Sequence, residues 1–389
     1  MAYDFSFFDR PLDRRGTACV KWDERAAMPE NGVPLWVADM DFRCADEIVG
    51  ALQDRAQHPC YGYTLVTEED RRAFTSFVKR HHGIDVSADE TALMPCVITG
   101  LKTLVRLYSA PGDQVAILTP VYGPFTSSIE GNQRKAVRVE LTRDASARYH
   151  IDFDRLEETL KSGVRLFLLC SPHNPVSRVW SREELSRILT LCRKYHTVLG
   201  VDEIHAEFVF PPHAFVSILS MADKEDQVIS LMSASKTFNI AGLQQAVAVS
   251  RNEGMLKSLR SALEAAGVTS GNIFALTATR AAYEQGDLWL EGVLRYLDHN
   301  REVVAREIAE RLPKAVLTPI EATYLAWLDL RAYAPDCAAL AEAFRKAGVA
   351  LTEGSFFGPE GEGFMRLNFG CPTAQLREGI KRMAGALNG

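Results

Sequence analysis

The sequence predicts an α/β fold in which helices flank a mainly parallel sheet and a smaller α+β unit follows. Between about residues 90 and 250, short apolar runs alternate with amphipathic segments of helical periodicity. Runs of this length without polar alternation are typical of strands that are buried on both faces of a parallel sheet. After about residue 285 the pattern changes to a long amphipathic helix followed by mixed strand and helix segments. These observations predict a large domain and a smaller one.

The strands predicted for the large domain are spaced as in repeated strand–helix–strand units. They are Gln114–Leu118, Val137–Leu141, Arg165–Cys170, Val198–Val201, Val228–Met232 and Ala246–Ser250. Ser181 and Glu184 have the spacing of a capping box, which marks the start of a helix. The apolar residues after it recur at helical spacing, at Leu185, Ile188, Leu189 and Cys192. Strand, helix and strand in this order predict a right-handed βαβ crossover.

We expect three parts along the chain. Residues 1–45 are irregular and rich in aromatic residues, prolines and charges, and they are expected to form an arm that joins the small domain. Residues 46–285 are the predicted large domain, and residues 286–389 are the predicted small one. The small domain is expected to contain a helix over Leu288–Leu312 and strands over Thr323–Leu330 and Met365–Phe369.

The composition is that of an ordinary globular protein. Of the 389 residues, 47% are hydrophobic and 24% are charged, and the net charge of −6 disfavours general nucleic-acid binding. No apolar run reaches the ~18 residues of a transmembrane helix, and the segment MAYDFSFFDRPLDRR lacks the pattern of a signal peptide. The dispersed cysteines have no metal-site spacing and predict reduced thiols. We expect a cytoplasmic protein that binds a small molecule, without a metal, nucleic-acid or membrane partner.

Polar residues follow three of the predicted strands at their carboxyl ends, where ligands gather in open α/β sheets. These residues are Asn174, Asp202 and Lys236. Taken singly, such residues are more often turn residues, helix caps or solvated charges. Lys236, however, lies between a buried strand and the apolar stretch 238–243. Partial desolvation there lowers the pKa of the amine and favours a nucleophile.

The segments around these residues, SPHNP, DEIH and SASKTFNIAGL, together resemble those of fold-type I pyridoxal 5′-phosphate (PLP) enzymes of the aminotransferase class I/II superfamily. The resemblance implies that PLP is the cofactor and that Lys236 binds it covalently and is the catalytic residue. It implies that Asp202 pairs with the pyridinium nitrogen of PLP. It also implies that Asn174 donates a hydrogen bond to the phenolic oxygen of the cofactor.

Further positions match the same superfamily residue by residue. Tyr122 resembles the aromatic residue that stacks on the cofactor ring. Val97 and Ile98, in a segment expected to precede a helix, resemble backbone ligands of the phosphate, and Ser233 resembles a hydroxyl ligand of the same phosphate. Tyr61 resembles the tyrosine that reaches the phosphate from the neighbouring subunit, which implies a homodimer with a shared active site.

Arg366 resembles the arginine that binds the α-carboxylate of the substrate, because a planar guanidinium offers two parallel hydrogen bonds. Asn174 is expected to orient the same carboxylate. His205 is open to two interpretations, since it either lines the cofactor pocket or forms a hydrogen bond in the core. Without the surrounding motifs, Tyr122, Tyr61 and Arg366 would be interpreted as a core aromatic, a turn residue and an edge-strand cation.

Longer segments narrow the resemblance to the MalY/PatB-type cystathionine β-lyases, which are cysteine-S-conjugate β-lyases. They are PLWVADMDF (34–42), YGYT (61–64), EATYLAWLDLR (321–331) and GFMRLNFGCP (363–372). The resemblance extends nearly end to end and assigns Ala38, in the first segment, to substrate binding. General aminotransferases usually carry a phosphate-binding arginine where this chain has Gln244, and this difference favours the lyase branch.

The resemblance implies a lyase in which the Lys236 amine takes the Cα proton of cystathionine or a related L-cysteine S-conjugate, with release of a thiol, pyruvate and ammonia. An aminotransferase acting on an L-amino acid is the alternative. A non-catalytic regulatory protein on the same fold is a further alternative, which the intact set of site residues disfavours. Gly123 stands in place of an expected histidine and is expected to leave space beside the cofactor ring. Ser177 stands in place of an expected glycine.

Overall fold

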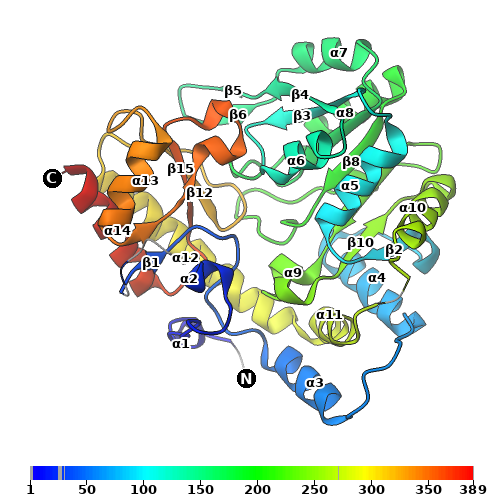
Figure 1. The fold of residues 1–389 in the computed structure, drawn as a ribbon, viewed down its shortest axis with the longest axis horizontal. Helices are drawn as coiled ribbons and strands as arrows, with labels where there is room; N and C mark the ends of the chain where they lie inside the picture. Colours follow the sequence, from blue (N-terminus) through cyan, green and yellow to red (C-terminus); the bar gives the residue numbers. More distant parts are fainter. Residues whose placement is uncertain (1–2, 25–28, 30, 270, 389) are drawn as a thin grey trace.

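The computed structural model describes residues 3–24, 29, 31–269 and 271–388, and its centre is a seven-stranded sheet (Figure 1). In the order in which they lie side by side, the strands are β2 (Thr91–Met94), β10 (Ala246–Val249), β9 (Val228–Met232), β8 (Val198–Asp202), β7 (Leu166–Cys170), β3 (Gln114–Thr119) and β4 (Lys135–Glu140). The strands from β9 to β4 are parallel, while β10 and β2 extend the sheet in antiparallel pairs. The predicted α/β class and mainly parallel sheet are confirmed.

Each apolar run predicted as a strand of this sheet is a strand, with small differences at the ends. β2 was not predicted, because its segment TALM is too short for its periodicity to separate strand from helix. It pairs with β10, with Met94 opposite Ala246 and Thr91 opposite Val249. The missing strand is therefore fixed by a pairing with residues far along the chain rather than by its own pattern.

Helices cover both faces of the large sheet. They are α3 (Asp46–Gln57), α4 (Glu68–His82), α5 (Val97–Tyr108), α6 (Pro124–Glu130), α7 (Phe153–Lys161), α8 (Arg182–Tyr195), α10 (Glu253–Ala265) and α11 (Ile273–Gln285). Leu166 and Leu168 of β7 belong to the apolar cluster with α5, α6 and α10. Phe167 and Leu169 belong to the opposite cluster, with α4, α8 and α11. This alternation explains why β7 is an unbroken apolar run.

The predicted start of α8 is confirmed in detail. The backbone N–H of Ser181 donates to Glu184 Oε2 at 2.7 Å, and the backbone N–H of Glu184 donates to Ser181 Oγ at 3.2 Å. The two bonds satisfy donors that the first turn of a helix would otherwise leave free. α8 joins β7 to β8, so this segment forms the predicted βαβ unit.

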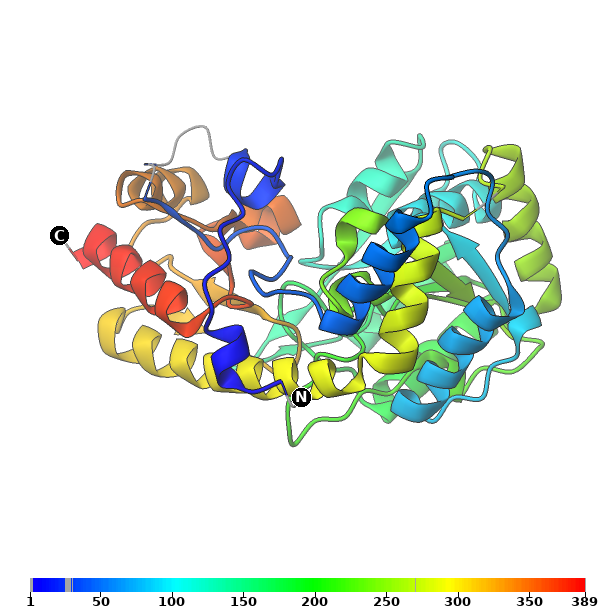
Figure 2. The same cartoon turned by 90° about the horizontal axis from the view of Figure 1, so that it is seen from below.

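A second, antiparallel sheet forms from the C-terminal part of the chain. Its strands, in spatial order, are β11 (Val316–Leu317), β12 (Leu325–Asp329), β15 (Phe364–Asn368) and β14 (Thr352–Glu353). The long helix α12 (Asp287–Arg311) crosses from the large sheet unit to this smaller one (Figure 2), and α13 (Cys337–Lys346) and α14 (Thr373–Asn388) lie beside the smaller sheet (Figure 1). The helix and strands predicted here are α12, β12 and β15, while the predicted domain boundaries stay a prediction.

The N-terminal segment lies against the smaller sheet unit. The aromatic ring of Phe8, in α1 (Phe5–Phe8), packs on α12, with ring centroids 5.9 Å from Trp289 and 5.5 Å from Tyr296. β1 (Val33–Pro34) pairs in parallel with β13 (Val349–Ala350). The contacts are those expected of an arm, although the predicted end of the arm at residue 45 is not tested by them.

Four charged side chains, Arg14, Lys21, Asp39 and Asp41, form a largely buried cluster that ties residues 14–21 to residues 36–42 within the arm. Lys21, in α2 (Val20–Asp23), is 0% exposed, and its Nζ lies 2.8 Å from Asp41 Oδ2. Arg14 lies 2.6 Å from Asp39 and 2.7 Å from Asp41. Burial opposes the charge of Lys21, but the two carboxylates outweigh it and raise the pKa of its amine. Lys21 and Arg14 in turn lower the pKa of Asp41, so these three groups are ionised and hold one another in place.

Removing Lys21 leaves the buried Asp41 and the partly buried Asp39 with one guanidinium between them. We expect Lys21→Met to lower the apparent free energy of unfolding by about 3–5 kcal/mol, measured by urea unfolding. Lys79→Met is the matched control, because the side chains of Lys79 and Asp85 form an ion pair that is 64% and 83% exposed. Such a pair contributes about 0–1 kcal/mol. Equal losses in the two variants would contradict a stabilising role of the cluster.

Candidate active site

The carboxyl ends of β7, β8 and β9 border a cavity of about 160 Å³. Asn174 follows β7, Asp202 is the last residue of β8, and Lys236 lies in α9 (Ala234–Thr237), directly after β9. All three line the cavity. The structure places further predicted site residues in the same lining, namely Ala38, Val97, Ile98, Tyr122 and His205. Residues from distant parts of the sequence thus meet at one point, as parallel strands at a common edge require.

A backbone carbonyl holds the amine of Lys236. Nζ donates a hydrogen bond to the carbonyl oxygen of Ala38 at 2.5 Å. Burial lowers the pKa of the amine to about 8; Arg366 acts in the same direction, while nearby carboxylates oppose the shift. A lysine with this pKa reaches its neutral, nucleophilic form much closer to physiological pH than an exposed one.

Asp202 is a buried acid beside this amine. Its Oδ1 accepts a hydrogen bond from the backbone N–H of Ile204 at 3.0 Å. Burial raises the pKa of the carboxyl to about 7, and the backbone bond and the charge of Lys236 offset this only in part. A carboxyl with this pKa ionises readily when a cation is placed next to it. The position therefore suits a partner for a protonated ring nitrogen.

Arg366, in β15 of the smaller sheet, lies behind the cavity wall and contacts the lining residue Asn174. Its Nη1 donates to Asn174 Oδ1 at 3.1 Å, and its Nη2 donates to the Trp36 carbonyl at 2.9 Å. The side chain is buried, burial lowers the pKa of the guanidinium to about 10, and Nε has no hydrogen-bond partner within the described residues. A buried guanidinium with a free donor is suited to bind a carboxylate.

The N-terminus of α5 also faces the cavity. Val97 and Ile98 are the first residues of this helix, and the N-cap residue Cys96 makes no side-chain capping bond. Val97 and Ile98, which were predicted to lie in a segment that precedes the helix, therefore belong to its first turn. Free N–H groups at such a terminus bind anions, and phosphate in particular.

Tyr122 and His205 are both uncharged in this setting. Burial raises the pKa of the Tyr122 hydroxyl, and the backbone N–H of Tyr122 donates to the Asn174 carbonyl at 3.1 Å. Burial, with the charges of Lys236 and Arg366, lowers the pKa of His205 to about 3. Nδ1 of His205 has no partner among the described residues. Its place in the lining favours the first of its two interpretations.

Two predicted phosphate ligands do not reach the cavity of this chain. The Ser233 hydroxyl donates to the Gln245 carbonyl at 2.5 Å and accepts from the Ser235 backbone N–H at 3.0 Å, so it caps α9. The side chain of Tyr61 is 56% exposed, and its hydroxyl donates to the Ala56 carbonyl at 2.8 Å. The role of Tyr61 was predicted for the active site of a neighbouring subunit, which a single chain does not test. The phosphate-binding roles of Ser233 and Tyr61 both stay predictions.

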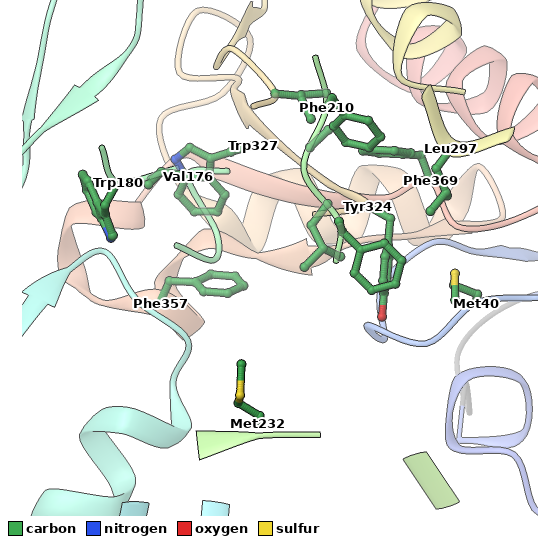
Figure 3. Packing of buried hydrophobic residues seen from close by; sticks show 14 of the residues in the cluster. Met40, Val176, Trp180, Phe210, Met232, Leu297, Tyr324, Trp327, Phe357 and Phe369 are labelled. Atoms are coloured by element: carbon green, nitrogen blue, oxygen red, sulfur yellow. The ribbon is translucent and has the colours of Figure 1, made fainter. Parts of the chain in front are cut away.

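Several residues near the amine were not predicted. Ser235 and Gln245 line the cavity, and the Tyr324 hydroxyl donates to the Ala38 carbonyl at 3.0 Å. Figure 3 shows Tyr324 directed from the smaller sheet unit toward the N-terminal segment that carries Met40. A buried tyrosine needs a partner for its hydroxyl, but that partner lies 286 residues away in the chain. The sequence pattern alone carries no signal for such a contact.

The expected open space beside Gly123 is a prediction that the structure contradicts. A Cβ atom at Gly123 would lie 2.7 Å from the carbonyl oxygen of Phe356 and 3.0 Å from its ring. Phe356 belongs to the 3₁₀-helix η4 (Gly354–Phe357) of the smaller sheet unit, so the space is filled by a residue distant in sequence. Ser177 adopts the left-handed conformation that favours the expected glycine, with φ of 55°. Its hydroxyl donates to the Leu325 carbonyl at 2.6 Å.

Two absences hold over residues 3–24, 29, 31–269 and 271–388, the part of the chain that the structure describes. None of the helices in these ranges is long and apolar enough to cross a membrane. Within the same ranges, no group of three or more histidine, cysteine, aspartate or glutamate side chains is placed to hold a metal ion.

The fold and site are those of a known family. Residues 31–383 match the family described as aminotransferase class I and II, and the chain belongs to it. It is 37% identical to cystathionine β-lyase PatB of Bacillus subtilis over 98% of this chain and 100% of that protein. It is 34% identical to the protein MalY of Escherichia coli over 98% of both chains. The resemblance to MalY/PatB-type proteins is confirmed.

Solved structures show the same likeness. Cystalysin from Treponema denticola, which contains a PLP cofactor, superimposes with a TM-score of 0.94 at 32% identity over 100% of this chain and 99% of that one. The PLP-bound C-S lyase of Staphylococcus hominis gives a TM-score of 0.91 at 31% identity over 98% of both chains. The predicted fold-type I architecture is confirmed.

The setting of Lys236 predicts a titration in protein prepared without cofactor. Only the neutral amine reacts with acylating reagents, so modification of Lys236, followed by peptide mass spectrometry, is expected to reach half its maximal rate near pH 8. Asp202→Asn removes a negative charge that favours the ammonium form and is expected to move this midpoint to lower pH. A midpoint near the ordinary lysine value of about 10.4 would contradict the described environment.

Proposed function

We propose that the protein is a PLP-dependent carbon–sulfur β-lyase that cleaves L-cysteine S-conjugates, cystathionine or a related compound, to a thiol, pyruvate and ammonia. The observation that carries the proposal is the meeting of the Lys236 amine, the Asp202 carboxyl and the Arg366–Asn174 pair at one buried cavity. The full-length similarity to cystathionine β-lyase PatB supports the reaction type.

The groups around the cavity fit PLP on their own chemistry. The uncapped start of α5 offers the N–H groups of Val97 and Ile98 to a phosphate. Asn174 uses its amide oxygen to accept from Arg366, which leaves its N–H groups for the phenolic oxygen of the cofactor. Asp202 would pair with the ring nitrogen, and Lys236 would bind the carbonyl carbon covalently. Tyr122 would stack on the ring.

PLP supplies the electron withdrawal that makes the Cα proton of a bound amino acid acidic. The side chains of this chain perform the remaining work. Arg366 binds the α-carboxylate through its free Nε–H and so orients the Cα–H bond. The Lys236 amine then takes the Cα proton, a contribution of about 10²–10⁴-fold for a positioned general base.

The three products, a thiol, pyruvate and ammonia, follow from cleavage of the C–S bond. The C–S bond breaks, and the sulfur departs with the bonding electron pair and gains a proton to form the thiol. One water is consumed as the remaining three-carbon fragment becomes pyruvate and ammonia. An aminotransferase would use the same residues but would return the proton to the cofactor and require an added keto acid. The two reactions therefore differ in what is released without a keto acid.

The first assay adds L-cystathionine and S-alkyl-L-cysteines to the PLP-loaded protein without a keto acid. We expect pyruvate and free thiol in equal amounts. Lys236→Ala is expected to abolish both products and the absorbance band of lysine-bound PLP. No pyruvate from any conjugate, together with amino transfer once a keto acid is supplied, would replace the lyase proposal with the aminotransferase.

We further infer that the protein is a homodimer with shared active sites. Tyr61, Tyr63 and Leu65 are 56%, 105% and 83% exposed, which is unusual for three neighbouring apolar side chains. A partner subunit that covers this segment would remove its apolar surface from water and place Tyr61 near the second active site. All eight cysteines are free thiols, which favours a reducing compartment such as the cytoplasm.

A complementation experiment tests the shared site. Lys236→Ala and Tyr61→Ala subunits are each expected to give low activity as pure proteins. When the two are refolded together in equal amounts, half of the dimers are hybrids with one intact site, so about a quarter of the wild-type activity is expected. No recovery of activity, or full activity of Tyr61→Ala alone, would contradict the shared site. Sedimentation of the wild type reports the dimer independently.

A further inference from the structure

The aromatic ring of Phe356 lies beside the candidate site and is 47% exposed. Its ring packs edge-on against Tyr122 of the cavity lining, with centroids 5.8 Å apart at 61°. The closeness depends on Gly123, because a Cβ atom there would lie 2.7 Å from the Phe356 carbonyl oxygen. Gly123 thus permits an apolar ring to sit next to the site.

Hydrogen bonds fix η4, which carries Phe356, to the large sheet unit. The Val121 backbone N–H donates to the Phe357 carbonyl at 3.0 Å. The Thr119 hydroxyl donates to Glu360 Oε1 at 3.0 Å, in the 3₁₀-helix η5 (Pro359–Gly361) that follows η4. The guanidinium of Arg366 lies 4.9 Å from the ring of Phe357. The Phe356 ring is therefore held against Tyr122, and the neighbouring Phe357 ring, 5.2 Å away from it between centroids, contacts the arginine expected to bind the carboxylate.

The cavity offers little to a second charged group. Among the described residues that line it, Lys236 and Asp202 are the side chains that carry or acquire charge near neutral pH, and His205 is neutral. Both charged groups are engaged in the proposed function. Cystathionine ends in a second ammonium and carboxylate, and such charges are costly to bury without partners. An uncharged substituent would instead gain an apolar contact with Phe356.

We propose that Phe356, seated on Gly123, makes the site select L-cysteine S-conjugates with an uncharged apolar or aromatic S-substituent over cystathionine. The inference rests on the proposed function, because it names the substrate class of the same site. Phe356 is then a specificity-determining residue supplied by the smaller sheet unit.

Binding of unreactive amino acids tests this selection. L-Norleucine resembles an apolar conjugate, while LL-diaminopimelate ends, like cystathionine, in a second amino-acid head. Each is titrated into the PLP-loaded protein, and the Kd is read from the change in cofactor absorbance. The wild type is expected to bind norleucine more tightly by roughly tenfold or more. Phe356→Ala and Gly123→Ala are each expected to lose most of this preference, the latter by displacing η4.

Phe5→Ala is the matched control, because Phe5 is 41% exposed and packs on Tyr296, away from the cavity. It is expected to keep the preference for norleucine. Tighter or equal binding of diaminopimelate by the wild type, or an unchanged preference in Phe356→Ala, would overturn the inference. Neither amino acid contains a C–S bond, so these results do not depend on lyase activity. Failure of the proposed function would show instead as absence of pyruvate from every conjugate.

Discussion

Hydrogen bonds from side chains to the backbone of residues 36–42 hold the candidate site together. Lys236 and Tyr324 donate to the Ala38 carbonyl, and Arg366 donates to the Trp36 carbonyl. Asn368 and Asn239 bind further carbonyls of the same segment, those of Val37, Asp39, Met40 and Phe42. The donors come from both sheet units, and Arg14 and Lys21 hold the same segment through Asp39 and Asp41. Residues 36–42 are therefore one strip of backbone at which side chains from both halves of the fold meet.

Burial acts on the groups of the cavity in a common way. It lowers the pKa of Lys236 and raises that of Asp202, so both groups are moved toward their neutral forms. A ligand that brings charges of its own then finds a matching group for each one. The start of α5 suits a phosphate, Asp202 suits a ring cation, and Arg366 suits a carboxylate. The burial that makes the Lys236 amine reactive is therefore the same burial that favours the binding of a charged ligand.

The sequence was informative where function depends on local pattern. Buried strands can be recognised in the sequence as unbroken apolar runs. Asn174, Asp202 and Lys236 follow three of these runs, so it could be predicted that they meet at the edge of the sheet. Contacts between the two sheet units were not. Tyr324 reaches Ala38, and Phe356 fills the space beside Gly123, across more than 200 residues of chain. Hydrophobic periodicity gives no information about contacts between residues so far apart in the sequence. The prediction at Gly123 was wrong because Phe356 could not be identified as its neighbour.

Recognition through carbonyl oxygens has an evolutionary consequence for residues 36–42. The hydrogen bonds to the carbonyls of Trp36 and Ala38 do not involve the side chains of these residues, because every amino acid has the same backbone carbonyl. Substitution of Ala38 leaves its carbonyl available as an acceptor, whereas insertion or deletion of one residue shifts every acceptor out of register with its donor. The length of the segment is therefore fixed, and so are Asp39 and Asp41, which pair with Arg14 and Lys21, whereas Ala38 is held by its carbonyl alone. New specificities can therefore arise at Ala38, whose side chain lines the cavity, while its carbonyl still accepts from Lys236.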